Sequence, residues 1–97
     1  MKIAIVQLQP EFPDSWDIVP APRYGVITVT NALAQAGFDV TAYVEKLVRY
    51  GEIKRAAREA DIIGFSLLSP NAERSDALAD AMRRMGKKVI FGGPHVN

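Results

Sequence analysis

The chain has 97 residues, the size of one domain, with 48% hydrophobic and 24% charged residues, an ordinary balance for a globular protein. Its formal net charge of +1 and scattered basic residues give no basic face of the kind that binds nucleic acid. The absence of cysteine excludes thiolate metal sites and iron–sulfur ligation within this chain. No apolar run is long enough to cross a membrane or to form a signal peptide, so we expect a cytoplasmic protein.

Short β-branched segments alternate along the chain with segments of helical spacing. Four apolar runs predict strands at residues 2–8, 38–44, 62–68 and 88–91. The first, third and fourth runs have continuous apolar middles, which is typical of strands covered on both faces. The second run alternates its apolar residues with Asp39, Thr41 and Tyr43, which predicts a half-exposed edge strand.

Three segments between the strands predict helices. Each repeats apolar or small residues on one face: Val26, Val29, Thr30 and Leu33; Ile53, Ala56, Ala57 and Ala60; Leu78, Ala81, Met82 and Met85. Gly37 and Gly86 follow the first and third helices as C-terminal stops. Ser69 and Pro70 suit the cap and the first position of the third helix.

This alternation predicts parallel strands joined by right-handed crossovers. An edge-like second strand favours the order 2-1-3-4, a flavodoxin-like (Rossmann-like) doubly wound sheet in three α/β/α layers. We expect a crevice at the switch between the first and third strands, lined by residues 7–9 and 66–70. A flavodoxin-like sheet has a fifth strand and this chain stops after the fourth, so we expect residues 1–97 to be one domain of a longer protein.

The loop over residues 9–22 carries four prolines and is longer than a routine connection. Its aromatic residues Phe12 and Trp16 could stack on a planar ligand, dock on a partner or fold back as a small lid. The acids near them have no histidine or second cluster to complete a metal site. Gly25, where the loop enters the first helix, allows a ligand to approach or serves packing alone.

Other candidate groups lie after the third and fourth strands. Ser66 and Ser69 offer hydroxyls at the switch point that could bind a ligand. The alternative is structural: Ser69 caps the third helix, and the Ser66 hydroxyl bonds to the backbone at the end of the third strand. Gly92 and Gly93 let a ligand approach the backbone or simply form a turn. His95, the only histidine, is a metal ligand, a hydrogen-bond donor or a surface residue.

No catalytic triad, Walker A loop, G-x-G-x-x-G fingerprint or flavin phosphate cradle is present in the sequence.

Four segments together resemble the N-terminal cobalamin (vitamin B12)-binding domain of radical S-adenosylmethionine enzymes. They span residues 22–25, 33–40, 60–66 and 89–95. The closing Gly-Gly-Pro-His, together with the preceding Ala-Asp-Ile-Ile-Gly strand, is the more specific part. By this resemblance, Ser66 and Leu68 match an S-x-L element that contacts the nucleotide tail of cobalamin. Gly92 and Gly93 match a glycine pair that makes room for the tail.

The resemblance and the switch-point position together give a set of cofactor-binding candidates, with no catalytic and no metal-ligating residue: Gln7, Gln9, Tyr24, Gly25, Ser66, Leu68, Ser69, Gly92, Gly93 and Pro94. The D-x-H-x-x-G motif that supplies a cobalt ligand in the methionine-synthase branch is absent after the first strand. The C-x-x-x-C-x-x-C cluster motif is absent too, so the iron–sulfur cluster and S-adenosylmethionine would belong to a downstream radical S-adenosylmethionine domain, the expected partner.

Three interpretations of function therefore remain. The first is a cobalamin-binding module that performs no catalysis alone and serves a methyltransferase-like parent enzyme. The second is a degenerate structural or interaction domain that has kept the fold and lost the ligand. The third, a different small α/β enzyme or nucleotide binder, has least support because no phosphate cradle was found. The fourth strand could also pair weakly with another copy of the chain through its exposed edge.

Overall fold

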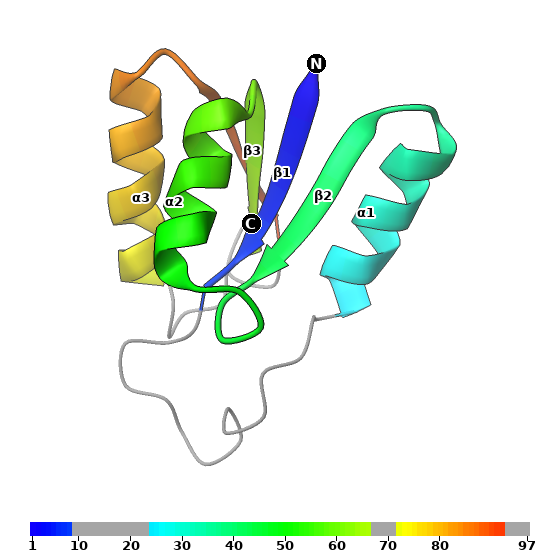
Figure 1. Cartoon of the computed structure of the whole chain (residues 1–97), viewed down its shortest axis with the longest axis horizontal. Helices are drawn as coiled ribbons and strands as arrows, with labels where there is room; N and C mark the ends of the chain where they lie inside the picture. Colours follow the sequence, from blue (N-terminus) through cyan, green and yellow to red (C-terminus); the bar gives the residue numbers. More distant parts are fainter. Residues whose placement is uncertain (9–23, 67–71, 93–97) are drawn as a thin grey trace.

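The computed structural model describes residues 1–8, 24–66 and 72–92 of the chain. Strands and helices alternate through this part of the protein (Figure 1) in the order β1 (Lys2–Gln7), α1 (Tyr24–Gln35), β2 (Asp39–Val44), α2 (Tyr50–Glu59), β3 (Ile62–Ser66), α3 (Ala72–Arg84) and β4 (Lys88–Gly92). Each sequence-predicted strand and helix is present. None of the helices described is long and apolar enough to cross a membrane.

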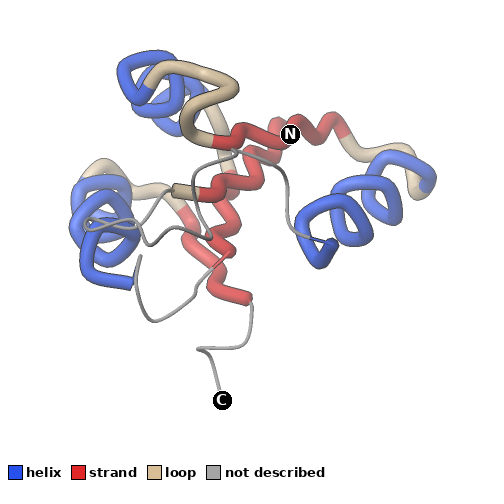
Figure 2. The backbone as a smooth tube through the Cα atoms, turned by 90° about the horizontal axis from the view of Figure 1, so that it is seen from below, coloured by secondary structure: helices blue, strands red, loops and turns tan. Residues whose placement is uncertain are grey.

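All the described strands are parallel, in the order β2-β1-β3-β4. This confirms the predicted flavodoxin-like winding, with chain order reversing at β1 and β3. Helices α2 and α3 lie on one side of the sheet and α1 on the other, as the view along the strands shows (Figure 2). The two sides are therefore covered unequally, and that inequality creates the site described below.

The side under α2 and α3 holds the larger core. Its buried residues are Ala4, Val6, Leu8, Ile53, Ala57, Ala60, Ile63, Phe65, Leu78, Ala79 and Met82. Small residues on α2, such as Ala57, bring that helix close to the sheet, as the sequence predicted. Burying each large aliphatic side chain here stabilises the fold by roughly 1.5–3 kcal/mol, so this side anchors the domain.

The side under α1 holds a smaller core of Ile3, Ile5 and Val26. Residues of β1 alternate between the two sides, and both sets are buried, which is why β1 has a continuous apolar run. Helix α1 crosses only part of this side. The end of the sheet at β4 has no described helix over it on that side (Figure 2).

The prediction that the fourth strand is covered on both faces was wrong. In β4, Val89 and Phe91 pack on the larger core, whereas Ile90 on the α1 side is 52% exposed. A continuous apolar run indicates that both faces of a strand are suited to burial, but it does not show which element covers each face. Strand β4 is thus an edge strand with an apolar face open beside α1.

The predicted helix stops at Gly37 and Gly86 are confirmed, and both glycines have positive φ angles, 93° and 81°. After α1, the Phe38 amide donates to the Leu33 carbonyl, and after α3 the Lys87 amide donates to the Met82 carbonyl, each at 3.1 Å. These are the hydrogen bonds of a Schellman C-cap, which requires a left-handed residue that glycine adopts without strain. The predicted cap at Ser69 lies outside the described residues.

Candidate ligand-binding cavity

An apolar cavity of about 450 Å³ lies on the α1 side of the sheet, between α1 and the exposed faces of β3 and β4. It occupies the part of that side that α1 leaves uncovered. Its lining consists of Ile3, Ile5, Gly25, Val26, Val29, Leu33, Phe38, Ile62, Gly64, Phe65, Ser66, Ile90, Phe91 and Gly92. Volumes of roughly 300–1,000 Å³ are usual for sites that hold small molecules or cofactor parts.

Strand alternation explains which sheet residues face the cavity. Side chains at every second position point to the same face, so Ile62, Gly64 and Ser66 of β3 share the α1 side. The register places Gly64 beside both Ile5 and Ile90, and places Ser66 beside Gly92. The sheet therefore contributes successive rows of lining residues from the start of β3 to its end.

The cavity runs the full length of β3, from Ile62 to Ser66, which is about 13 Å at the usual rise per strand residue. One end is at the carboxyl ends of the strands, where the lining includes the register partners Ser66 and Gly92, and Gly25 at the start of α1. The other end lies between Leu33 and Phe38, near the C-terminus of α1. A long, narrow group could enter from the strand-end edge and run down alongside α1.

Two of the glycines at the strand-end edge leave space open. A Cβ atom placed on Gly25 or on Gly92 would have no heavy atom of the described residues within 4 Å. The missing side chains there therefore leave room rather than satisfy packing. Helix α1 also begins at this edge, and its first turn holds no acidic residue, so its helix dipole favours an anion there.

The lining offers almost no polar chemistry. Ser66 carries the one polar side chain among the described lining residues, and none of them is charged. No group of three or more metal-ligating side chains occurs within residues 1–8, 24–66 and 72–92. The described lining residues include no nucleophile–base pair.

The structure brings three sequence-predicted site residues together: Gly25, Ser66 and Gly92. Tyr24 begins α1, and its side chain lies outside what the structure describes. Five other candidates also lie outside the described residues: Gln9, Leu68, Ser69, Gly93 and Pro94. Trp16, Phe12 and His95 fall there as well, so their predicted roles stay predictions.

Gln7 is buried at the end of β1 but is not among the lining residues of the cavity. Its carbonyl accepts a 2.9 Å hydrogen bond from the Glu45 amide, which extends the pairing of β1 with β2 by one residue. Most of the lining expected for the crevice between β1 and β3, residues 9 and 67–70, lies outside the described residues. The role predicted for Gln7 in cofactor binding stays a prediction.

Sequence reasoning missed the walls of the cavity. Val26, Val29 and Leu33 of α1 and Ile90 of β4 were assigned only to packing, yet they line the cavity. Val29 is 48% exposed, and Ile27 beside it is also exposed. The sequence of α1 does contain an indication of this: its apolar residues are too many to lie on a single face of the helix, which is typical of a helix that borders two apolar surfaces.

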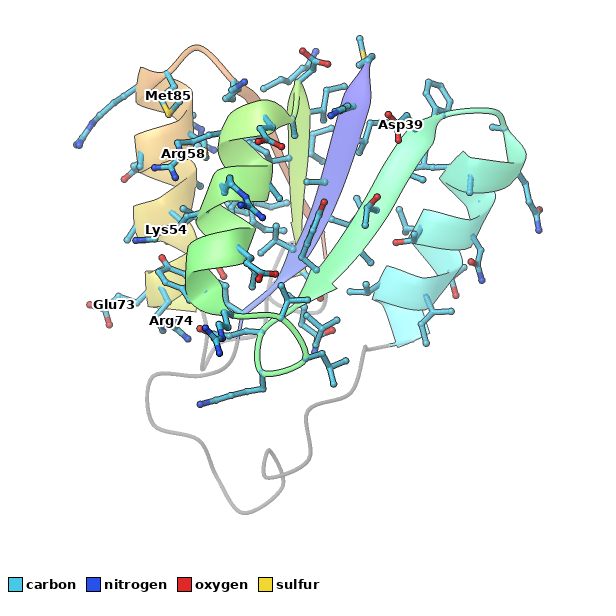
Figure 3. The ribbon with its side chains drawn as sticks, in the orientation of Figure 1. Asp39, Lys54, Arg58, Glu73, Arg74 and Met85 are labelled. Atoms are coloured by element: carbon cyan, nitrogen blue, oxygen red, sulfur yellow. The ribbon has the colours of Figure 1, made fainter. Side chains whose placement is uncertain are left out.

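The other side of the same strand-end edge is held by an ion pair. Arg74 in the first turn of α3 donates two hydrogen bonds to Glu45, which follows β2, at 2.5 and 2.7 Å. The Arg74 guanidinium also lies over the ring of Tyr50, 5.3 Å from its centroid. Figure 3 shows Arg74 at the end of α3 opposite to Met85. These contacts fix the starts of α2 and α3 relative to the sheet.

A doubly wound parallel sheet in the order β2-β1-β3-β4 defines the flavodoxin-like class of α/β domains. The sequence model of the B12-binding domain matches residues 20–97, and the chain belongs to this family. Comparison with curated proteins and with solved structures gives no significant match.

Proposed function

We propose that this chain is a cobalamin-binding module in which the nucleotide tail of the cofactor enters the cavity beside α1 while the corrin ring lies across the strand ends. The observation that carries the proposal is the open space at Gly25 and Gly92, at the mouth of an apolar cavity, in a member of the B12-binding domain family. The cavity is far too small for the whole cofactor, so only the tail fits within it.

The residues present fit the parts of that tail. The benzimidazole base is flat and apolar, which suits walls made of Val26, Val29 and Ile90. The phosphodiester of the tail would lie near the mouth, where the helix dipole of α1 favours an anion. Gly92 and Gly25 would let the sugar and phosphate pass without meeting a side chain.

The cobalt chemistry would be set without a ligand from the loop after β1, because that loop contains no histidine. Cobalamin supplies a cobalt centre able to carry a methyl group or take part in radical reactions. This chain's residues would bind and orient the cofactor and exclude water from its tail. In this proposal the parent is a radical S-adenosylmethionine enzyme, supported by the resemblance of residues 22–25, 33–40, 60–66 and 89–95.

The test is binding of hydroxocobalamin to the purified 97-residue chain. We expect a change in the visible spectrum on mixing, and co-elution of the cobalamin absorbance with protein on gel filtration at high micromolar concentration. The same chain unfolded in urea should give neither signal. Folded protein that gives no spectral change and no co-elution would refute the proposal, and it would favour the degenerate structural or interaction domain.

A further inference from the structure

We propose that the cavity selects corrinoids by the chemistry of their lower base, accepting an apolar base such as dimethylbenzimidazole and disfavouring a purine. This inference rests on the proposed function, because it takes the cavity beside α1 as the tail site. It adds a specificity that follows from the lining itself.

The first step is the scarcity of hydrogen-bond partners. Of the fourteen described residues that line the cavity, Ser66 alone has a polar side chain, and it is the last residue of β3, at the strand-end edge. A base that passes Ser66 next meets the row of Ile5, Gly64 and Ile90. Beyond that row the lining side chains are aliphatic or aromatic.

The second step concerns the backbone, which could replace missing side chains. Ile5 and Gly64 are paired in the ladder between β1 and β3, and Gly64 is also paired with Ile90 of β4. In a parallel ladder, the amide and carbonyl groups of an inner strand point to its neighbours within the sheet plane. Strand β3 lies between β1 and β4, so its backbone groups are used there and do not project into the cavity.

The third step is the polarity of the two bases. Adenine attached to ribose keeps three free ring nitrogens and an amino group, whereas dimethylbenzimidazole keeps one ring nitrogen and carries two methyl groups. In this lining, most of the adenine groups would lose their water without gaining a partner. A single polar group left unpaired in this way weakens binding about tenfold, so a clear preference should result.

The experiment compares four corrinoids by equilibrium dialysis with the 97-residue chain: cobalamin, adeninylcobamide, cresolylcobamide, whose base is an apolar phenol, and cobinamide, which has no base. We expect cobalamin and cresolylcobamide to bind with similar affinity, and adeninylcobamide about tenfold or more weakly. Cobinamide should also bind weakly, because it lacks the tail.

The outcomes separate this inference from the proposed function. If adeninylcobamide binds as tightly as cobalamin, the selectivity is refuted although the module still binds cobalamin. If cobinamide binds as tightly as cobalamin, the cavity does not hold the tail and the inference is likewise refuted. If none of the four binds, the proposed function fails and this inference fails with it.

A variant pair tests whether the lining causes the selectivity. Val29 is a wall residue that is about half exposed, so the fold should tolerate substitution there. Val29→Asn places an amide beside the base, and we expect it to narrow the gap between adeninylcobamide and cobalamin several-fold. Val29→Leu keeps the wall apolar and should leave the ratio unchanged. An unchanged ratio in both variants, with adeninylcobamide still weak, would mean that this wall does not set the preference.

Discussion

The side chain of Ile5 occupies the space that a side chain on Gly64 would need. A Cβ atom placed on Gly64 would lie 3.0 Å from Cδ1 of Ile5, and the two residues are register partners on neighbouring strands. Ile5 thus leans across β3 at mid-height of the cavity, where both residues are part of the lining. Gly64 is needed for the packing of β1 on β3, whereas Gly25 and Gly92 face open space.

Gly64→Ala should destabilise the domain. The added methyl group meets Cδ1 of Ile5 at a distance that real Cβ contacts rarely show, so the Ile5 side chain must shift by a few tenths of an ångström. We expect the free energy of unfolding to fall by about 1–3 kcal/mol, measured by urea denaturation.

A second substitution identifies the cause. Ile5→Val removes Cδ1 and alone should cost about 0.5–1.5 kcal/mol. In the double variant the new methyl group gains the space that Cδ1 has left, so the combined loss should be smaller than the sum of the two single losses. Additive losses would contradict the contact between Ile5 and Gly64 as the source of the strain.

Alanine in place of glycine should have opposite effects at two positions. Gly86 ends α3 with a φ of 81°, where a side chain is strained, so Gly86→Ala should lower stability by about 1 kcal/mol. Gly51 is the second residue of α2, with open space around its Cβ position, so Gly51→Ala should raise stability by up to about 0.5 kcal/mol. Thermal unfolding of both variants checks this, and a shift of the same sign in both would contradict it.

The fold was predictable because its determinants are local. Apolar runs, helical spacing and the stops at Gly37 and Gly86 each depend on a few neighbouring residues, and the alternation in β2 was enough to place it at the edge. The exposure of Ile90 was not predictable in this way. The apolar sequence of β4 shows that both of its faces are suited to burial. Whether a helix covers the face that carries Ile90 depends on the path of the whole chain.

The site was predicted in part for the same reason. Ser66 and Gly92 were identified because they end adjacent strands, and their register confirms that they are partners. The walls were missed because Val29 looks like an ordinary packing residue until α1 is placed over β3. Apolar walls carry no motif, so a sequence reveals the polar and glycine positions of such a site before its volume.

The ion pair between Glu45 and Arg74 should contribute measurably to stability. Its side chains are only 11% and 27% exposed, and two hydrogen bonds join them. Glu45→Ala would leave the Arg74 guanidinium without this partner near the start of α3. We expect the free energy of unfolding to fall by about 1–3 kcal/mol, between the values for exposed and buried pairs.

A matched pair on the surface provides the control. Asp80 contacts Arg83 through one hydrogen bond of 3.3 Å, with the Asp80 side chain 61% exposed. Asp80→Ala should change stability by less than about 0.5 kcal/mol. Urea denaturation of the two variants side by side measures the difference, and equal losses would contradict the importance of the Glu45–Arg74 geometry.

Gly92→Val should block the proposed cofactor site without damaging the fold. A Cβ atom at this position has no atom of the described residues within 4 Å, and valine suits a strand, so thermal stability should stay close to that of the original chain. The added methyl groups would project into the mouth of the cavity, and cobalamin binding should weaken about tenfold or more, measured by equilibrium dialysis.

The control for Gly92→Val is Lys88→Val. Lys88 lies on the same strand and, by alternation, on the same face, but at the opposite end and outside the cavity lining. This variant introduces the same side chain into β4 and should bind cobalamin as the original chain does. The two variants place the same side chain on the same face of β4 at its opposite ends, so equal losses in both would point to a general effect on the strand. Unchanged binding in Gly92→Val would mean that the tail does not pass this residue.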